Sequence, residues 1–461
     1  LERLTKWDLA IKIARDTLKA RLGTAAKAPY VALDLLKAAK DNDRVRGFER
    51  EDEALSELIS GDQFHASIYA FDLVQKRAKR PAGAPDKALA RPVRKVGVIG
   101  AGLMASQFAL LFVRKLRVPV IITDLDQSRV DKGLAYIREQ IDALQEKGRL
   151  TSDDANQLRA LVHGTTDKSE FADCDWVIEA VFEELGVKQA VFAEIEPIIS
   201  ETAVLATNTS SLSVEEIGAN LAHPERLVGF HFFNPVAVMP LIEVVNTPAT
   251  DDATLATAMV TARNLGKNAV ITADRPGFVV NRLLAKVMGE AARALDEGTP
   301  LPVVEQALAP IGLPMGPFEL IDLVGWKVAA HVQDTMVEAF PERFYASPNL
   351  HAIAELDEPL VKSKIGKVED LSKAAKKALT FGKTPVDAAE ILRRVEDELA
   401  GEIKIMLDEK VVAAAEDIDL CLILGAGWPF QAGGATPYLD RVGASQRVFG
   451  ADFHTPRIAG V

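Results

Sequence analysis

The stretch that decides the fold is Val96-Gly97-Val98-Ile99-Gly100-Ala101-Gly102-Leu103-Met104-Ala105. Its first four residues predict a short buried strand, and the glycines directly after them predict a tight turn into a helix over 106–116. A second apolar run at 120–123 predicts the next strand, which ends in Asp124. A strand, a GxGxxA turn, a helix, a strand and an acid in this order are typical of a Rossmann-type α/β domain that binds a dinucleotide.

Each residue of this turn has a predicted task in holding the dinucleotide. Gly100 makes the tight turn, and Gly102 lets the backbone approach the pyrophosphate at the positive end of the helix. Ala105 replaces the usual third glycine, which requires slightly wider packing between helix and strand. Asp124 lies where an acid accepts hydrogen bonds from the adenosine ribose. Because an acid there repels a 2′-phosphate, the sequence predicts NAD rather than NADP.

A second region places a histidine and a carboxylate on two neighbouring apolar strands. Leu227–Phe232 and Leu241–Val245 have the composition of buried strands. Glu243 is costly to bury in such a run unless it is paired, and adjacent strands would bring His231 near it. The carboxylate would then hold one ring nitrogen and leave the other as a base suited to neutral pH. The alternative interpretation is a core histidine that is satisfied by any acceptor.

A short polar loop follows the predicted strand 203–207, with the sequence Thr207-Asn208-Thr209-Ser210-Ser211. Open α/β folds bind their ligands at the carboxyl ends of their strands, so this loop is a candidate ligand contact. For Ser211 and Ser213, a turn that caps the next helix is a strong alternative interpretation. That alternative is weaker for Asn208 and Ser210.

The composition restricts the class of protein. A chain of 461 residues with 48% hydrophobic and 26% charged residues is expected to be globular, with two to four domains. Its 54 basic and 66 acidic residues argue against nucleic acid or an anionic membrane as the main partner. Two cysteines and no long apolar run predict no cysteine metal site, no transmembrane segment and a cytoplasmic location. Because the chain begins with Leu1, we expect it to be part of something longer.

The sequence divides into four predicted parts. Residues 1–92 have the pattern of helices with charged faces and close in a basic linker rich in Pro and Gly. Residues 93–275 form the predicted NAD-binding domain, in which helices separate parallel strands. After Asp274 we expect only helices, arranged as two all-α domains over 276–380 and 381–461.

The two helical domains are predicted from an internal repeat. Gly289-Glu290 recurs 112 residues later as Gly401-Glu402, and Pro317-Phe318 recurs as Pro429-Phe430. Two tandem copies of one helical domain are the simplest account. Position 281 is Asn in the first copy, whereas its counterpart 393 in the second copy is Arg. We therefore expect the first copy to face the NAD-binding domain and the second copy to be structural.

Together these residues resemble the L-3-hydroxyacyl-CoA dehydrogenase family over about residues 93–442. The most specific matches are Val98–Met104, Thr207–Ser211, His231–Pro235 and Arg275–Arg282. The doubled helical domain is similar to the bacterial multifunctional fatty-acid-oxidation α subunit, and residues 28–92 are similar to the end of its hydratase domain. The oxyanion loop and the glutamates of the hydratase are absent from this sequence, so no hydratase activity is expected.

The resemblance implies oxidation of (S)-3-hydroxyacyl-CoA to 3-ketoacyl-CoA by NAD in fatty acid β-oxidation. It implies that His231 is the general base oriented by Glu243, and that Ser210 and Asn281 contact the substrate oxygen. The implied NAD contacts are Gly100, Gly102, Leu103, Met104, Asp124, Glu183, Lys188, Asn208 and Asn234. The resemblance also implies an acyl-CoA substrate and a thiolase β subunit as partner. Because Asn281 lies in the helical part, we expect domain closure when acyl-CoA binds.

Two other functions compete with this one. Another NAD-dependent alcohol or hydroxyacid dehydrogenase would usually take its base from a lysine or a tyrosine, which His231 with Glu243 argues against. The alternative from another class is a non-catalytic NAD-binding scaffold that holds the thiolase partner. The complete set of Ser210, His231, Glu243 and Asn281 argues against a scaffold.

Overall fold

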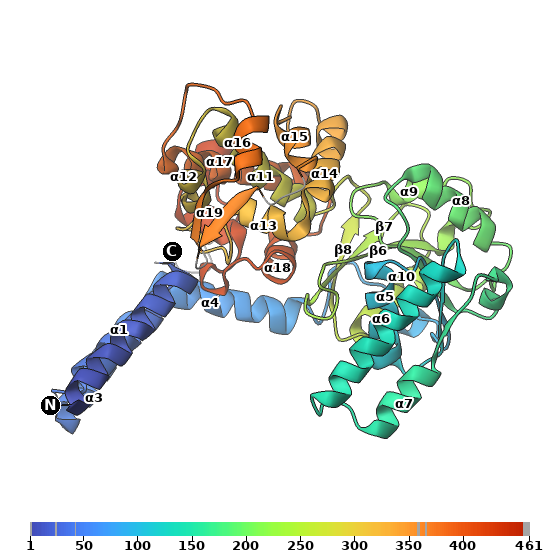
Figure 1. Ribbon diagram of the computed structural model, residues 1–461, viewed down its shortest axis with the longest axis horizontal. Coiled ribbons are helices and arrows are strands. Elements are labelled where there is room, and N and C mark those ends of the chain that lie inside the picture. The colour runs from blue at the N-terminus through green and yellow to red at the C-terminus, as the bar shows by residue number, and fades with distance from the viewer. Residues whose placement is uncertain (1, 24, 42, 357–359, 365–366, 455–461) are drawn as a thin grey trace. The chain divides into compact units, whose positions relative to one another are not determined.

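The computed structural model describes residues 2–23, 25–41, 43–356, 360–364 and 367–454 (Figure 1). The chain divides into two compact units. The α/β unit contains Arg77–Val279 and the short segment Lys410–Ala413, and the helical unit contains the rest. The helical unit takes in both predicted all-α domains and the helices before the linker. The limits of the four predicted parts stay predictions.

An eight-stranded sheet forms the centre of the α/β unit, in the order β3-β2-β1-β4-β5-β6-β7-β8. The pairings from β3 through β2, β1, β4 and β5 to β6 are all parallel. The patterns in the sequence did not single out β3 and β8. The strands are β1 Val96–Ile99, β2 Val120–Thr123, β3 Val162–Gly164, β4 Trp176–Glu179, β5 Val204–Thr207, β6 Leu227–Phe232, β7 Leu241–Asn246 and β8 Asn268–Ala273.

Strand β7 corrects the expectation of a sheet in which helices separate parallel strands. Only residues 233–240 connect β6 to β7, whereas a parallel crossover needs about a dozen residues or more. The two strands therefore pair antiparallel, and β8 then pairs parallel with β7. The antiparallel register sets His231 directly opposite Glu243.

Helices cover both faces of the sheet, because alternate residues of each strand point to opposite sides (Figure 1). Helix α5 begins three residues earlier than predicted, directly after Gly102. One face packs against α5 (Leu103–Leu116), α6 (Gln127–Glu146), α7 (Ser152–Ala160) and α10 (Asp252–Asn264). The other face packs against α8 (Leu185–Ile195) and α9 (Val214–Ile217). Short 3₁₀ turns lie at Lys87–Leu89, Lys168–Phe171 and Pro224–Arg226.

The helical unit contains one small hairpin, β9 (Val361–Lys364) with β10 (Lys367–Leu371), so the expectation of helices alone after Asp274 is wrong. Its first helices are α1 (Glu2–Leu22), α2 (Ala28–Ala38), α3 (Arg44–Ile59) and α4 (Asp62–Asp72). Those of the first repeat region are α11 (Val280–Asp296), α12 (Leu301–Ala307), α13 (Pro317–Val324), α14 (Trp326–Ala339), α15 (Leu350–Ala354) and α16 (Lys373–Ala378). Those of the second are α17 (Ala388–Asp408), α18 (Ala415–Gly425), α19 (Ala435–Arg441) and α20 (Ala444–Phe449).

Helices α11 and α17, which begin the two repeat regions, lie against each other. Arg282 on α11 is fully buried, and its guanidinium reaches Glu402 at 2.5 Å and Glu409 at 2.8 Å on the α17 side. Arg393, the counterpart of Asn281, is exposed and pairs with Glu390 on its own helix. Buried ion pairs therefore join α11 to the α17 side, while position 393 faces solvent, and the tandem repeat itself stays a prediction.

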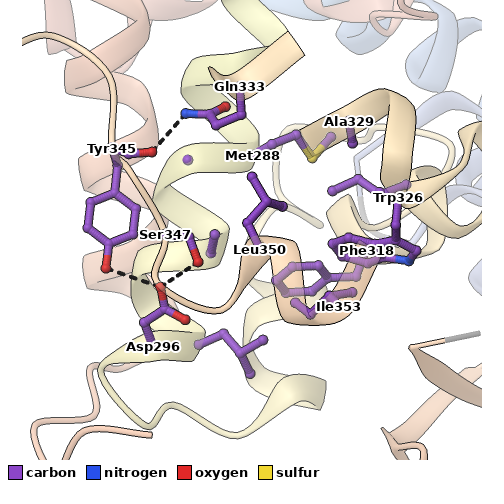
Figure 2. A pocket seen from close by; sticks show the side chains of 14 residues that line it. Met288, Asp296, Phe318, Trp326, Ala329, Gln333, Tyr345, Ser347, Leu350 and Ile353 are labelled. Atoms are coloured by element: carbon purple, nitrogen blue, oxygen red, sulfur yellow. Dashed lines mark hydrogen bonds between the residues drawn. The ribbon is translucent and has the colours of Figure 1, made fainter. Parts of the chain in front are cut away.

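A small cavity lies among α11, α13, α14 and α15 (Figure 2). Its wall is mainly apolar, with Met288, Phe318 and Trp326 among the residues that line it. At one side Asp296 accepts hydrogen bonds from Tyr345 at 3.1 Å and from Ser347 at 2.7 Å. The cavity has a volume of about 30 Å³, room for about one or two water molecules. It is a packing void, too small for an acyl chain.

Candidate active site

The turn between β1 and α5 has the geometry that its sequence predicts. Gly100 has a φ of +106°, and a Cβ there would lie 2.7 Å from the carbonyl oxygen of Ala180. This position therefore requires glycine. A Cβ on Gly102 would meet nothing within 4 Å, so the backbone is open on that side, as the approach of a pyrophosphate requires. Ala105 is fully buried.

Asp124 lies directly beside this turn. Its carboxylate accepts a hydrogen bond from the backbone N–H of Ala101 at 2.7 Å and another from Leu125 at 2.7 Å. The carboxylate of Asp124 thus fixes the glycine turn, and its charge lies at the carboxyl end of β2. Strand β1 lies between β2 and β4, the point where the strand order reverses and where open α/β sheets bind their ligands.

Strands β6 and β7 bring His231 and Glu243 together, which confirms the predicted contact. Nδ1 of His231 lies 2.7 Å from Oε2 of Glu243. Glu243 is fully buried and His231 is 5% exposed. The rings of Phe233 and Phe278 lie 4.6 Å and 5.7 Å from the imidazole centroid. The carboxylate occupies Nδ1, so Nε2 is the ring nitrogen available for proton transfer.

A turn before α11 gives Glu243 a further contact that the sequence analysis did not identify. The backbone N–H of Val279 donates to Oε1 of Glu243 at 3.1 Å. The two residues before it, Gly277 and Phe278, both have positive φ, at +71° and +47°. A non-glycine residue is uncommon in this region. The Pro276-Gly277 pair was the signal in the sequence for such a turn.

The polar loop after β5 is held by Glu183. One oxygen of this carboxylate accepts hydrogen bonds from the hydroxyl of Thr209 at 2.8 Å and from the backbone N–H of Ser210 at 2.6 Å. It also accepts from the hydroxyl of Ser210 at 3.1 Å and from the backbone N–H of Ser211 at 3.2 Å. Glu183, a predicted NAD contact, therefore also fixes the loop that carries Ser210.

Asn208 and Asn234 flank the end of the strand that carries His231. The side-chain oxygen of Asn208 accepts a hydrogen bond from the backbone N–H of Phe232 at 2.9 Å. Asn234 precedes a cis proline, and its side-chain oxygen lies 3.5 Å from the amide nitrogen of Gln107. Asn208, a predicted NAD contact, is therefore bonded to the residue that follows His231 on β6.

The two serines with a capping alternative behave differently. Ser213 is the N-cap of α9, where its hydroxyl accepts from Glu216 at 3.2 Å and donates to Asp274 at 2.7 Å. The capping interpretation of Ser213 is therefore confirmed. The hydroxyl of Ser211 is buried and makes no hydrogen bond within the described part of the chain, so it caps no helix there.

Glu179, at the end of β4, is a buried residue that the sequence analysis missed. Its two oxygens lie 2.8 Å and 2.9 Å from Nζ of Lys188, and it accepts a hydrogen bond from the hydroxyl of Thr207. Lys188 also reaches Glu183 at 3.2 Å. Burial lowers the pKa of Lys188, but the two carboxylates outweigh it and hold that pKa above its ordinary value. The signal in the sequence was an acid at the end of the apolar run Trp176-Val177-Ile178.

The remaining predicted site residues have less defined surroundings. Leu103 and Met104 form the first turn of α5, directly after the glycine turn. Asn281 lies on α11 in the helical unit, and its contact with the substrate oxygen stays a prediction. Among the described residues, no three His, Cys, Asp or Glu side chains form a group that could hold a metal ion. The described helices also include none with the length and apolarity to cross a bilayer.

Comparison with known proteins identifies the family of two parts of the chain. Residues 95–275 match the NAD binding domain of 3-hydroxyacyl-CoA dehydrogenase, and residues 277–370 match its C-terminal domain. NAD is therefore the cofactor of the α/β unit. A fatty acid oxidation complex subunit alpha from Pseudomonas putida is 31% identical over 96% of this chain. The chain spans 64% of the length of that relative.

Solved structures give the same assignment. (S)-3-hydroxybutyryl-CoA dehydrogenase from Ralstonia eutropha is 31% identical, with a TM-score of 0.54 over 57% of this chain and 93% of its own. 3-Hydroxybutyryl-CoA dehydrogenase from Escherichia coli is 25% identical, with a TM-score of 0.65 over 79% of this chain and 96% of its own. The chain belongs to the 3-hydroxyacyl-CoA dehydrogenase family of NAD-dependent oxidoreductases.

Proposed function

We propose that this chain oxidises (S)-3-hydroxyacyl-CoA to 3-ketoacyl-CoA with NAD, as a step of fatty acid oxidation. The observation that carries the proposal is the buried contact of 2.7 Å between His231 and Glu243. A carboxylate on Nδ1 fixes the orientation of the ring and directs Nε2 to act as the base. This arrangement supplies a general base for removing the hydroxyl proton of an alcohol.

His231 moves the proton in the proposed mechanism. An alcohol loses hydride from carbon readily only when its hydroxyl proton is removed as the C–H bond breaks. Nε2 of His231 takes this proton, and the charge of Glu243 stabilises the imidazolium that forms. General-base help of this kind contributes about 10²–10⁴ in rate. Bound NAD supplies the hydride acceptor, and the protein supplies position and charge.

Ser210 and Asn281 complete the proposed site. Asn281 can donate a hydrogen bond to the C3 oxygen, where negative charge develops as the proton leaves. Ser210 can do the same once its single hydroxyl hydrogen turns away from Glu183. The four hydrogen bonds that Glu183 accepts from residues 209–211 support this role for Ser210, since they fix its loop. The role of Asn281 rests on the match of residues 277–370 to the family.

The proposed NAD site extends from the glycine turn to the end of β6. Gly100, Gly102, Leu103 and Met104 would hold the pyrophosphate against the start of α5, and Asp124 would hold the adenosine ribose. We assign Glu183, Lys188, Asn208 and Asn234 to the nicotinamide side. Lys188 is 1% exposed, so of these four it is the least accessible to a ligand.

The relative from Pseudomonas putida is named as a subunit of a fatty acid oxidation complex. This name supports an acyl-CoA substrate and a thiolase β subunit as the partner of this chain. The same name is also compatible with the second candidate function, a scaffold subunit that binds NAD and catalyses no reaction. We retain the cytoplasm as the proposed location.

Absorbance of NADH with acetoacetyl-CoA as substrate tests the proposal. We expect NADH to be consumed at a rate that saturates with acetoacetyl-CoA, and NADPH to be consumed far more slowly. Fluorescence of bound NADH is the parallel measurement. Tight NADH binding without consumption would contradict the proposed activity and support the scaffold.

A further inference from the structure

The site contains a buried carboxylate with no part in the proposed chemistry. Glu179 is fully buried, so it cannot touch a ligand. It holds the polar loop from two directions. Directly, it binds the hydroxyl of Thr207, whose oxygen accepts from the backbone N–H of Thr209 at 3.3 Å. Indirectly, it binds Lys188, which binds Glu183, which binds Ser210.

The two oxygens of Glu183 divide their contacts. Oε2 faces Lys188 at 3.2 Å, whereas Oε1 accepts all four hydrogen bonds from residues 209–211. Lys188 lies closer to Glu179, at 2.8 Å and 2.9 Å. Glu179 therefore draws the ammonium group toward β4. Oε1 of Glu183 is therefore left to accept the hydrogen bonds from residues 209–211.

Stability alone gives a poor reason for this arrangement. Moving a lysine and a glutamate out of water is costly, and well-packed apolar residues often stabilise a core as well or better. A buried charge network that is fully hydrogen-bonded does, however, restrict its neighbours to one arrangement. The neighbour here is Ser210.

We propose that Glu179 is a positioning residue, which acts through Lys188 and Glu183 to hold the backbone of Ser210 in place. From this position the Ser210 hydroxyl can turn from Glu183 and donate to the substrate oxygen. The inference deepens the proposed function and rests on it. When the charge of Glu179 is removed, Lys188 is left with Glu183 alone and turns that carboxylate away from the loop. Ser210 then loses the backbone contact that fixes its place in the loop.

A double-mutant cycle of Glu179→Gln with Ser210→Ala tests the inference. The measurement is kcat and KM for acetoacetyl-CoA in the full chain at saturating NADH. Loss of one oxyanion donor costs about 10²–10³ in kcat, so we expect that loss for Ser210→Ala. For Glu179→Gln we expect a loss of about 10–100-fold in kcat, since misplacement by about 1 Å can cost 10².

The decisive quantity is the effect of Glu179→Gln in the Ser210→Ala background. If Glu179 acts through Ser210, this effect falls to less than about 3-fold, because coupled residues are not additive. Equal losses in both backgrounds, or no loss in the wild-type background, would overturn the inference. A residue that only stabilises the fold would give equal losses.

A milder variant covers a failure of Glu179→Gln to fold. Glu179→Asp keeps the charge and shortens the side chain. With Ser210 intact, we expect this variant to retain most of the wild-type kcat. Its double-mutant cycle with Ser210→Ala should show the same coupling with a smaller magnitude. Wild-type protein without activity would overturn the proposed function and this inference with it. Active wild-type protein with additive losses would overturn the inference alone.

Discussion

The α/β unit buries two carboxylates in one sheet, and their partners differ. Glu243 on β7 pairs with His231, and Glu179 on β4 pairs with Lys188. Both acids are fully buried. Glu243 holds Nδ1 of His231 and leaves Nε2 for proton transfer, whereas the two carboxylates beside Lys188 raise the pKa of that lysine against the effect of burial. The first pair is therefore suited to proton transfer and the second to holding a fixed position.

A half-buried acid in the helical unit shows what happens when no cation among the described residues is paired with it. Glu305 accepts a hydrogen bond from the backbone N–H of Phe318 at 2.7 Å. In the described part of the chain no basic side chain forms an ion pair with it. Burial raises the pKa of Glu305 to about 7. With no paired cation to offset it, burial favours the protonated form of this carboxyl.

The largest effect is expected for His231→Gln. Loss of the base should lower kcat for acetoacetyl-CoA by about 10²–10⁴, while NADH binding stays within about 2-fold. His163→Gln is the matched control, because His163 is exposed and pairs with Glu170 at 3.1 Å. We expect the control to keep wild-type kcat. Retained kcat in His231→Gln would rule out the base.

A smaller effect is expected for Glu243→Gln, which keeps the shape of the side chain and removes its charge. The imidazolium loses its stabilisation, so kcat should fall by about 10–100-fold and its pH profile should shift. The exposed pair of His223 and Glu225, with a distance of 3.0 Å, supplies the control Glu225→Gln. A wild-type pH profile in Glu243→Gln would contradict the pairing.

Glu305→Gln tests the unpaired acid through stability. Because the folded pKa of about 7 lies above the ordinary value of 4.5, protonated Glu305 stabilises the fold fully below the ordinary value. This contribution is lost as the pH rises to 7. The difference should reach about 3 kcal/mol at most. Thermal unfolding from pH 4 to 8 should show a fall for wild type that is reduced in Glu305→Gln. Equal curves would contradict this assignment.

The smallest effect is expected for Asp124→Asn. The acid would lose its charge toward the ribose hydroxyls, so the Kd for NADH should rise about tenfold, equivalent to about 1.4 kcal/mol. The preference for NADH over NADPH should also shrink. Asp131→Asn, on the exposed side of α6, is the control. Unchanged affinity for both cofactors in Asp124→Asn would place the ribose elsewhere.

The sequence predicted the parts of the site that follow from local patterns. The glycine turn and the contact of His231 with Glu243 were both read from apolar runs with fixed spacing. Strand β3 was missed because its three residues give a weak pattern, whereas β8 has six residues and its apolar run 269–271 was not recognised as a strand. Glu179 was missed because the apolar run that contains it gives no sign that Lys188, nine residues later on a helix, is its partner. The antiparallel pairing of β7 depends on the short connection, which the predicted parallel sheet did not take into account.

The most direct test of the central claim follows a single turnover of acetoacetyl-CoA reduction by enzyme-bound NADH across a pH series. In this direction His231 must donate a proton, so the wild-type rate should fall as the pH rises. The His231→Gln rate should be small and independent of pH. A His231→Gln variant with the wild-type rate, or with the same dependence on pH, would contradict the claim that this imidazole transfers the proton.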